Sequence, residues 1–196
     1  MKILAFDIGG TKISSAVVSV CGKLLGEKTV CATPKSAYEI ESYVLQRLNE
    51  EEFDGVAIAT AGVIYDEKLL AKPHNLASGY ENINFHKLTS RPVLLENDAN
   101  AALWAEYKLG SLKGTEHAVM LTLGTGVGCG IICDGKILRG KTGAAGEVPF
   151  LLAGGDLAAL ARKYGLEEKD CFALYRLKNE HNPAAQSAYE IGRAHV

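Results

Sequence analysis

Short apolar runs separated by turn residues predict strands in the first half of the chain. Residues 3–8 form an almost continuous apolar run, residues 13–20 are rich in β-branched side chains, and glycines bracket a third piece at 22–26. Residues 56–59 and 93–95 have the composition of buried strands. This part of the chain is therefore expected to form a sheet.

Helical spacing marks two other segments. After Pro34, apolar residues recur at steps of three and four: Ile40, Tyr43, Val44 and Leu48. An alanine-rich stretch over 98–109 predicts a second helix, and Gly110 and Gly114 are placed to end it.

Strands return in the second half, at 118–123 and 129–133, and a tight turn at 134–135 follows them. After Gly146 the pattern changes to helices, which we expect at about 156–165, about 167–178 and from 182 onward. The order predicts an α/β protein with two related lobes, the first over residues 1–112 and the second over 113–190.

The composition is that of a globular protein. Of the 196 residues, 47% are hydrophobic and 22% charged, which argues against disorder, and no apolar run is long enough for a membrane-spanning helix. A formal net charge of −2 gives no basic patch for nucleic acid or a membrane surface. Five cysteines without a C-x-x-C motif fit a cytoplasmic protein, and we interpret Cys129 and Cys133 as small apolar residues.

A first candidate phosphate site lies at the end of the first strand. Asp7 closes that strand, and Gly9, Gly10, Thr11 and Lys12 follow it. Glycines let backbone N–H groups converge on an anion, and the hydroxyl and the ammonium group add to the attraction. The carboxylate can hold Mg²⁺ directly or through water. An ordinary hairpin turn is the alternative.

A second glycine-rich turn follows the strand at 118–123. It contains Gly124, Thr125, Gly126 and Gly128. No helix follows it, which excludes a Rossmann turn, whereas a hairpin that cradles phosphate fits. The alternative is a glycine-rich bend in a sheet.

Two carboxylates are candidate catalytic or sugar-binding groups. Asp98 lies where a strand ends and a helix starts, so it can act as general base toward a substrate hydroxyl that Asn97 orients, with the helix dipole keeping it ionised. The alternative is a plain helix N-cap. Glu147 follows the small residues 143–146 and can accept sugar hydroxyls, or be a solvated loop acid. His74 either lines the same cleft or is an ordinary surface histidine.

Taken together, four segments resemble the ROK family of repressors and sugar kinases in the actin/hexokinase-like superfamily. They occur in the family's order and at family-like separations, as residues 7–12, 96–102, 123–128 and 143–147. Residues 73–76 and 103–107 are most similar to the N-acetylmannosamine kinases of that family.

The resemblance implies a two-lobed, ribonuclease H-like fold that closes over a sugar. It implies Asp98 as base, ATP phosphates on the two glycine turns, and Mg²⁺ near Asp7. It also implies four sugar contacts, at Gly62, Asn75, Asn97 and Glu147. Members of the family are often homodimers.

The chain also departs from the family pattern. Pro149 and Phe150 stand where the family has a Gly-His pair, and the cysteine-rich zinc loop that follows in the family is missing. We therefore expect no zinc there and the loss of two usual sugar contacts.

The length is a further departure, because a full ROK kinase is a two-lobed unit of roughly 300 residues. Residues 191–196 match the translation of a common sequencing adapter, ATC-GGA-AGA-GCA-CAC-GTC. We interpret them as an artefact and expect the natural reading frame to continue past Glu190. The chain as given is then expected to be weakly active or inactive.

The sequence thus predicts ATP-dependent phosphorylation of a hexose or N-acetylhexosamine, with O6 as the expected acceptor. A ROK transcriptional regulator is one alternative, although only six residues precede Asp7, too few for a helix-turn-helix. A degenerate, non-catalytic sugar-binding protein is the other.

Overall fold

The computed structural model describes residues 1–70, 73, 75–123 and 127–147. The predicted turn at 124–126, His74, the Pro149–Phe150 pair and the helices expected after residue 156 lie outside these residues. Among the helices described, none is long and apolar enough to cross a membrane.

A five-stranded mixed sheet forms from the first half of the chain, in the order β3-β2-β1-β4-β7. Strands β1, β2 and β3 form an antiparallel meander, and β1, β4 and β7 run parallel. The bounds are β1 (Lys2–Ile8), β2 (Lys12–Ser19), β3 (Thr29–Ala32), β4 (Gly55–Thr60) and β7 (Val93–Asn97).

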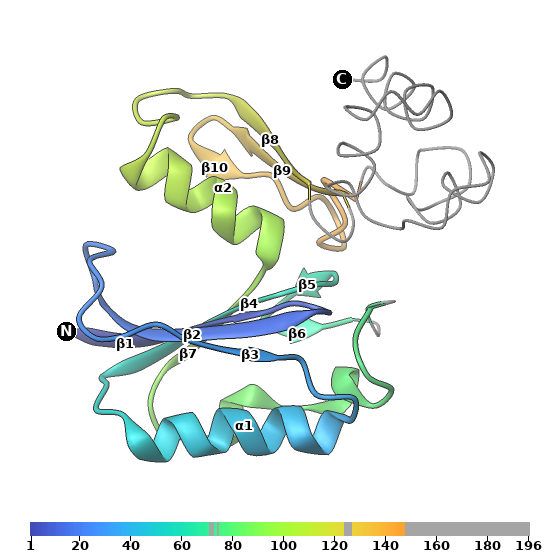
Figure 1. Ribbon diagram of the computed structural model, residues 1–196. Coiled ribbons are helices and arrows are strands. Elements are labelled where there is room, and N and C mark those ends of the chain that lie inside the picture. Colours follow the sequence, from blue (N-terminus) through green and yellow to red (C-terminus); the bar gives the residue numbers. More distant parts are fainter. Residues whose placement is uncertain (71–72, 74, 124–126, 148–196) are drawn as a thin grey trace, which may run out of the picture.

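One face of this sheet is covered by helix α1 (Ala37–Glu50), as Figure 1 shows. Ser36 caps the helix, because its Oγ accepts a hydrogen bond from Glu39 N and donates one to the Glu39 carboxylate at 2.8 Å. Ile40 and Val44 are buried against the sheet, as the helical spacing predicts.

The third strand lies later in the chain than the sequence pattern predicts. Residues 22–26 form the end of a long hairpin, in which Leu24 makes only an isolated bridge with Val18. The strand is β3, because its register sets Ala32 opposite Lys12 at the start of β2. The pairing register depends on residues that are distant in the sequence, so the local pattern could not place this strand. The glycines that bracket 22–26 mark the turn of the hairpin.

A second, three-stranded antiparallel sheet follows the sheet of the first half, in the order β10-β9-β8. Its strands are β8 (Ala118–Leu123), β9 (Val127–Cys133) and β10 (Lys136–Ile137), with the predicted Asp134–Gly135 turn between β9 and β10. Both turn residues have positive φ, at 53° and 70°.

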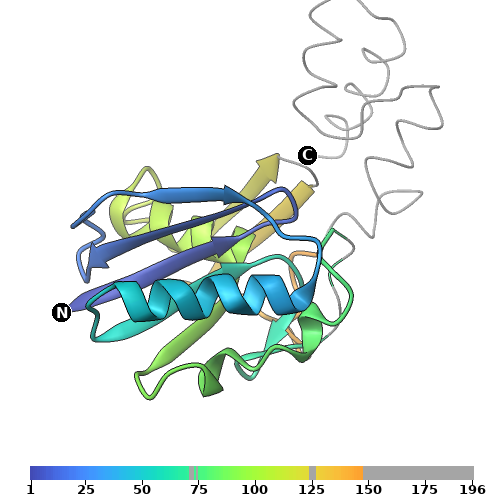
Figure 2. The same cartoon turned by 60° about the horizontal axis from the view of Figure 1, so that its bottom comes forward.

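Helix α2 (Asp98–Leu109) lies between the two sheets and packs chiefly on β9 (Figures 1 and 2). A Cβ at Gly130 would lie 2.8 Å from a methyl of Leu103, and one at Gly128 would lie 2.9 Å from Ala99 Cβ. Only glycine allows this approach of strand and helix. The domain boundary between residues 112 and 113 stays a prediction.

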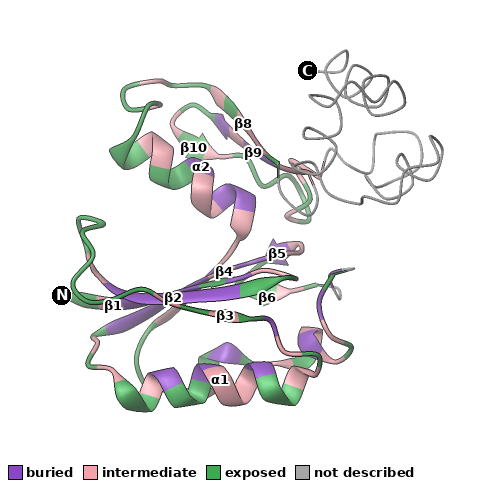
Figure 3. Cartoon of the chain, viewed as in Figure 1, coloured by how far each residue is buried: buried purple, intermediate pink, exposed green. Residues whose placement is uncertain are grey.

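The two faces of the five-stranded sheet differ in side-chain size. Large residues such as Leu4, Phe6 and Ile58 share one buried cluster with residues of α1. Figure 3 shows long buried stretches in the strands of this sheet. Ala5, Ala57 and Ala59 line a space of about 590 Å³ on the α2 side, together with Trp104 and Ile137.

The remaining short elements are β5 (Ile64–Tyr65), β6 (Lys68–Leu69) and 3₁₀ turns at Tyr80–Asn82 and Phe85–Lys87.

Candidate active site

Polar residues gather at the carboxyl ends of the parallel strands β1, β4 and β7. The register places Asp7, Ala59 and Glu96 in one row across the sheet. Thr60 and Asn97 lie in the next row, and Asp98 begins α2 directly afterwards. The predicted carboxylates Asp7 and Asp98 therefore belong to one edge of the sheet, where ligand sites of α/β proteins usually lie.

Asp98 is not the N-cap of α2. That position belongs to Asn97, whose Oδ1 accepts from Asn100 N at 3.0 Å. Asp98 is half-buried, and its Oδ1 accepts from Ala99 N at 2.8 Å. The helix cap is therefore supplied by Asn97, which leaves the Asp98 carboxylate available for chemistry.

The pKa of the Asp98 carboxyl is raised above its ordinary value. Burial is the largest cause, and the negative charge of Asp7 adds to it, while the hydrogen bond from Ala99 N opposes both. The expectation that the helix terminus keeps the group ionised stays a prediction, and burial works against it. A base with a raised pKa is a stronger proton acceptor.

Glu147 lies in the loop that follows β10, within reach of the charge of Asp98. Burial raises the pKa of Glu147, and the charge of Asp98 raises it further. The loop is held tightly: Gly146 and Gly143 have φ of 95° and 78°, and a Cβ on either would collide with a carbonyl oxygen, of Cys129 and of Ile64 respectively. Glu147 is accordingly a half-buried group at the site and not a solvated loop acid.

Asn97 and Gly62, two predicted sugar contacts, are joined to each other. The Asn97 side-chain amide donates to Gly62 O at 3.0 Å, while its oxygen caps α2. Gly62 has φ of 105°, a left-handed conformation that favours glycine. This bond ties the segment after β4 to the end of β7.

Sequence reasoning missed the partner of Glu96. Arg139 donates to both oxygens of the Glu96 carboxylate, at 2.8 and 2.6 Å, and Glu96 Oε1 also accepts from Asn97 N and from Asn100 Nδ2. The same carboxylate raises the pKa of Arg139. Glu96, two residues before Asp98, thereby connects the loop after β10 to the first turn of α2. Arg139 is 43 residues away along the chain, so no local pattern could reveal the pair.

A second group that the sequence did not single out lies behind the site. Tyr80 is fully buried, and its hydroxyl lies 2.7 Å from Thr60 Oγ1. Burial raises the pKa of Tyr80, and the charge of Asp98 contributes. The phenol is therefore neutral and supports the end of β4 next to Asp98.

The first glycine turn is a tight hairpin between β1 and β2. Gly9 N donates to Lys12 O at 3.0 Å, and Thr33 Oγ1 donates to Gly9 O. A Cβ at Gly10 would lie 2.6 Å from Asn75 Cβ, so the turn and the predicted sugar contact Asn75 are in close contact. Thr11 and Lys12 are exposed. The backbone bonds are those of an ordinary hairpin, and phosphate binding at this turn stays a prediction.

The second glycine turn is described only from residue 127 onward. Gly128 lies in β9, where its Cα faces Thr122 and the first turn of α2. Gly124, Thr125 and Gly126 lie outside the described residues. The close packing of β9 against α2 therefore explains why position 128 is a glycine, without any phosphate contact.

The ROK family model matches residues 3–161 of this sequence. The chain belongs to the ROK family. An N-acetylmannosamine kinase from Shigella flexneri is 37% identical over 163 residues, which cover 78% of this chain and 55% of that protein. The chain thus spans about half the length of the curated relatives it matches.

Solved ROK structures confirm the predicted actin/hexokinase-like α/β fold. The Lmo2764 protein from Listeria monocytogenes superposes with a TM-score of 0.78 at 27% identity, over 97% of this chain and 74% of that one. A ROK hexokinase from Thermus thermophilus gives 0.70 at 31% identity, over 96% and 72%. A ROK transcriptional regulator shares the fold at 21% identity and a TM-score of 0.72, over 95% and 58%, so the fold alone does not separate kinase from regulator.

The Asp7 carboxylate at this ROK site fits a hard divalent cation, because carboxylate oxygens are the ligand type that Mg²⁺ prefers. Among the described residues, Asp7, Asp98 and Glu147 do not all bring their oxygens within 4.8 Å of one another, so Asp7 is the residue that would hold the ion. The charge of Asp7 raises the pKa of Asp98, and the charge of Asp98 raises that of Glu147, which shows that these groups are close enough to repel one another. A cation beside Asp7 would offset that repulsion.

Proposed function

We propose that the intact ROK protein is a sugar kinase, which transfers the γ-phosphoryl group of ATP to a hydroxyl of a hexose or N-acetylhexosamine. The observation that carries this proposal is the half-buried Asp98 at the carboxyl edge of the sheet, with a raised pKa and within reach of the charge of Glu147. A base placed in this way suits the removal of a proton from an alcohol as its oxygen attacks phosphorus.

Asp98 accepts the proton of the sugar hydroxyl, with O6 as the proposed acceptor. The new bond joins that oxygen to the γ-phosphorus, the bond from phosphorus to the β–γ bridging oxygen breaks, and ADP leaves. Burial around Asp98 and Glu147 supports exclusion of water, which limits hydrolysis of ATP. Glu147, Asn97, Asn75 and the Gly62 backbone are the proposed sugar contacts.

Phosphate binding is proposed at the two glycine turns. Thr11 and Lys12 are exposed beside Asp7 on the first turn, in addition to Gly9 and Gly10. The second turn supplies Gly124, Thr125, Gly126 and Gly128. Mg²⁺ held near Asp7 would offset the phosphate charge.

The names of the relatives suggest the substrate to test first. The curated relatives are N-acetylmannosamine kinases, so we propose N-acetylmannosamine, with glucose as the comparison. A cytoplasmic location, a homodimer and the lobes 1–112 and 113–190 complete the proposal.

The test uses the complete gene product, obtained by reading the source DNA across codon 190. Asp98→Asn keeps the shape of the side chain and removes its basicity. We expect a coupled ADP assay to show a ~10²–10⁴-fold loss of kcat, the usual contribution of a general base, with sugar affinity retained in calorimetry.

Asp54→Asn is the matched control, because Asp54 lies before β4 at the opposite end of the sheet and is exposed. Normal turnover by Asp98→Asn would exclude Asp98 as base. Sugar binding without turnover by the unmodified protein would favour the regulator or the non-catalytic sugar-binding protein.

A further inference from the structure

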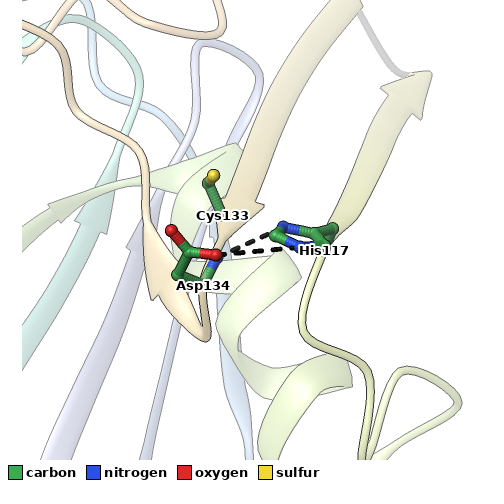
Figure 4. Close-up of side chains that lie close together, drawn as sticks. All are labelled: His117, Cys133 and Asp134. Carbon is green, nitrogen blue, oxygen red and sulfur yellow. Dashed lines mark hydrogen bonds and ion pairs between the residues drawn. The ribbon is translucent and has the colours of Figure 1, made fainter.

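Three metal-ligand side chains meet at the outer end of the β8–β10 sheet (Figure 4). His117 directly precedes β8, Cys133 is the last residue of β9, and Asp134 begins the turn to β10. All three are exposed, and one ligand atom from each lies within 4.8 Å of the others. This cluster, His117–Cys133–Asp134, is not part of the proposed kinase site.

Its position is remote from Asp98. The neighbouring Gly135 lies beside the hydroxyl of Tyr107, in the last turn of α2, whereas Asp98 is the first residue of that helix. A helix of 12 residues is about 18 Å long. In the sequence, the cluster also precedes the segment after residue 150, where the family's zinc loop is missing.

The backbone holds the three side chains together. Ala118 pairs with Ile132, so the next antiparallel position sets His117 opposite Cys133. Side chains directly opposite each other on antiparallel strands have Cβ atoms about 4.5–5.5 Å apart. Gly135 N donates to the backbone oxygen of Glu116 at 2.9 Å, which fixes the turn that carries Asp134.

The histidine ring lies against Asp134 at both of its nitrogens. Asp134 N donates to His117 Nδ1 at 3.3 Å, and His117 Nε2 lies 3.7 Å from Asp134 Oδ1. A metal ion binds a ring nitrogen through its lone pair, so an ion at Nδ1 replaces this long hydrogen bond. Neutral imidazole is the metal-binding form. The Asp134 carboxylate can either bind the ion or hold the ring by its N–H.

We propose that the His117–Cys133–Asp134 cluster binds a divalent transition-metal ion, with Zn²⁺ as the expected ion. A thiolate, an imidazole and a carboxylate together favour borderline-soft ions over Mg²⁺ and Ca²⁺. Cys133 loses its thiol proton to solvent when the ion binds, so the affinity falls at low pH. Three protein ligands leave one tetrahedral position for water.

The proposed ion cross-links the ends of neighbouring strands. The ion joins the start of β8, the end of β9 and the following turn, and it binds only the folded hairpin. Zn²⁺ is therefore expected to raise the stability of this sheet and to leave the chemistry at Asp98 unchanged. Cys133, interpreted from the sequence as a small apolar residue, is instead an exposed thiol with a chemical role.

Cobalt reports on the site directly. The tag-free 196-residue chain is titrated with Co²⁺, and we expect thiolate-to-cobalt absorption in the near ultraviolet that Zn²⁺ abolishes and excess Mg²⁺ does not. Cys133→Ser should remove the absorption. Cys21→Ser is the matched control, because Cys21 is also exposed but lies in the β2–β3 hairpin, and it should leave the absorption intact.

His117→Ala and Asp134→Asn then test the other two ligands. Each should weaken Zn²⁺ competition by at least ~10–100-fold, the loss caused by mutating even a supporting residue of a metal site. Absorption that is absent from the unmodified chain, that survives Cys133→Ser, or that is unchanged in both His117→Ala and Asp134→Asn would overturn the proposal.

Discussion

The five-stranded sheet and the β8–β10 sheet differ in how much apolar surface they bury. The first contributes, with α1 and the segments packed on it, to a cluster of fourteen buried hydrophobic residues. Among the described residues, α2 and the β8–β10 sheet bury four: Ala99, Leu103, Cys129 and Ile132. Val119 and Leu123 of β8 are 65% and 63% exposed.

The difference shows that the two sheets are stabilised by different interactions. The five-stranded sheet has its own hydrophobic core, whereas the β8–β10 sheet, among the residues that the structure describes, packs on α2 and makes specific contacts with the first half of the chain. Two of these contacts are described above: the Glu96–Arg139 pair and the approach of Gly143 to Ile64. The proposed site lies where the two sheets meet.

Core truncation should show the contrast most strongly. Ile58→Ala in β4 removes a side chain that is 2% exposed, so we expect a loss of about 2–5 kcal/mol in the free energy of unfolding. Val119→Ala in β8 should cost less than about 0.5 kcal/mol, because that side chain is already solvated. Urea unfolding followed by circular dichroism measures both, and equal losses would contradict the comparison.

Breaking the Glu96–Arg139 pair should have the next largest effect. Arg139→Ala leaves the Glu96 carboxylate, whose side chain is only 13% exposed, without its charged partner. We expect a loss of about 1–3 kcal/mol in the free energy of unfolding and a lower kcat, because Glu96 also holds the first turn of α2.

Arg91→Ala, at an exposed arginine just before β7, is the control for removing a surface positive charge. If Arg139→Ala behaved like Arg91→Ala in both unfolding and turnover, the pair would contribute only as an ordinary surface ion pair, of about 0–1 kcal/mol.

The loop that carries Glu147 can be tested at Gly143. Gly143→Ala should cost about 1–2 kcal/mol for its left-handed φ of 78° and more for the approach of Ile64 O. Gly114→Ala is the control, since Gly114 has φ of 87° and no atom within 4 Å of the place that an alanine methyl group would take. Thermal unfolding should rank Gly143→Ala as the more destabilised, and the reverse order would show that the loop does not depend on β5.

The smallest predicted effect is a pH-dependent gain in thermal stability when Asp98 is replaced by asparagine. Because the folded state raises the pKa of Asp98, ionisation of this group disfavours folding, and its stabilising contribution is lost as pH rises through the folded pKa. Asp98→Asn should therefore have a higher Tm than the unmodified chain at neutral pH. The difference should vanish below the ordinary Asp value of 3.8. An Asn variant that is less stable at neutral pH would show that Asp98 is not desolvated.

The sequence pattern predicted those helices and strands that are determined by residues close together in the chain. The spacing of Ile40 and Val44 predicted α1, and the bounds of β8 agree with the prediction. The prediction of the third strand was wrong because its position depends on pairing with Lys12, which the residues at 22–26 do not encode.

The same distinction holds at the site. Asp98 and Glu147 could be proposed from their neighbours in the sequence, and the structure places them within reach of each other's charge. The Glu96–Arg139 pair could not be predicted, because its two residues are 43 positions apart in the sequence and meet only in the folded protein. Whether Asn97 or Asp98 caps α2 also could not be decided, because both residue types are good caps.

The bond between Asn97 and Gly62 has a consequence for inhibitor design. The side-chain amide of Asn97 is already engaged at both its oxygen and its nitrogen. Its nitrogen still has a second N–H and its oxygen a second lone pair, so a ligand hydroxyl can bind this amide, already held in one orientation, without breaking either bond. Groups that donate to Glu147 or Asp98 also relieve an unfavourable desolvated charge, so compounds that contact this amide and those two carboxylates together should gain affinity from each.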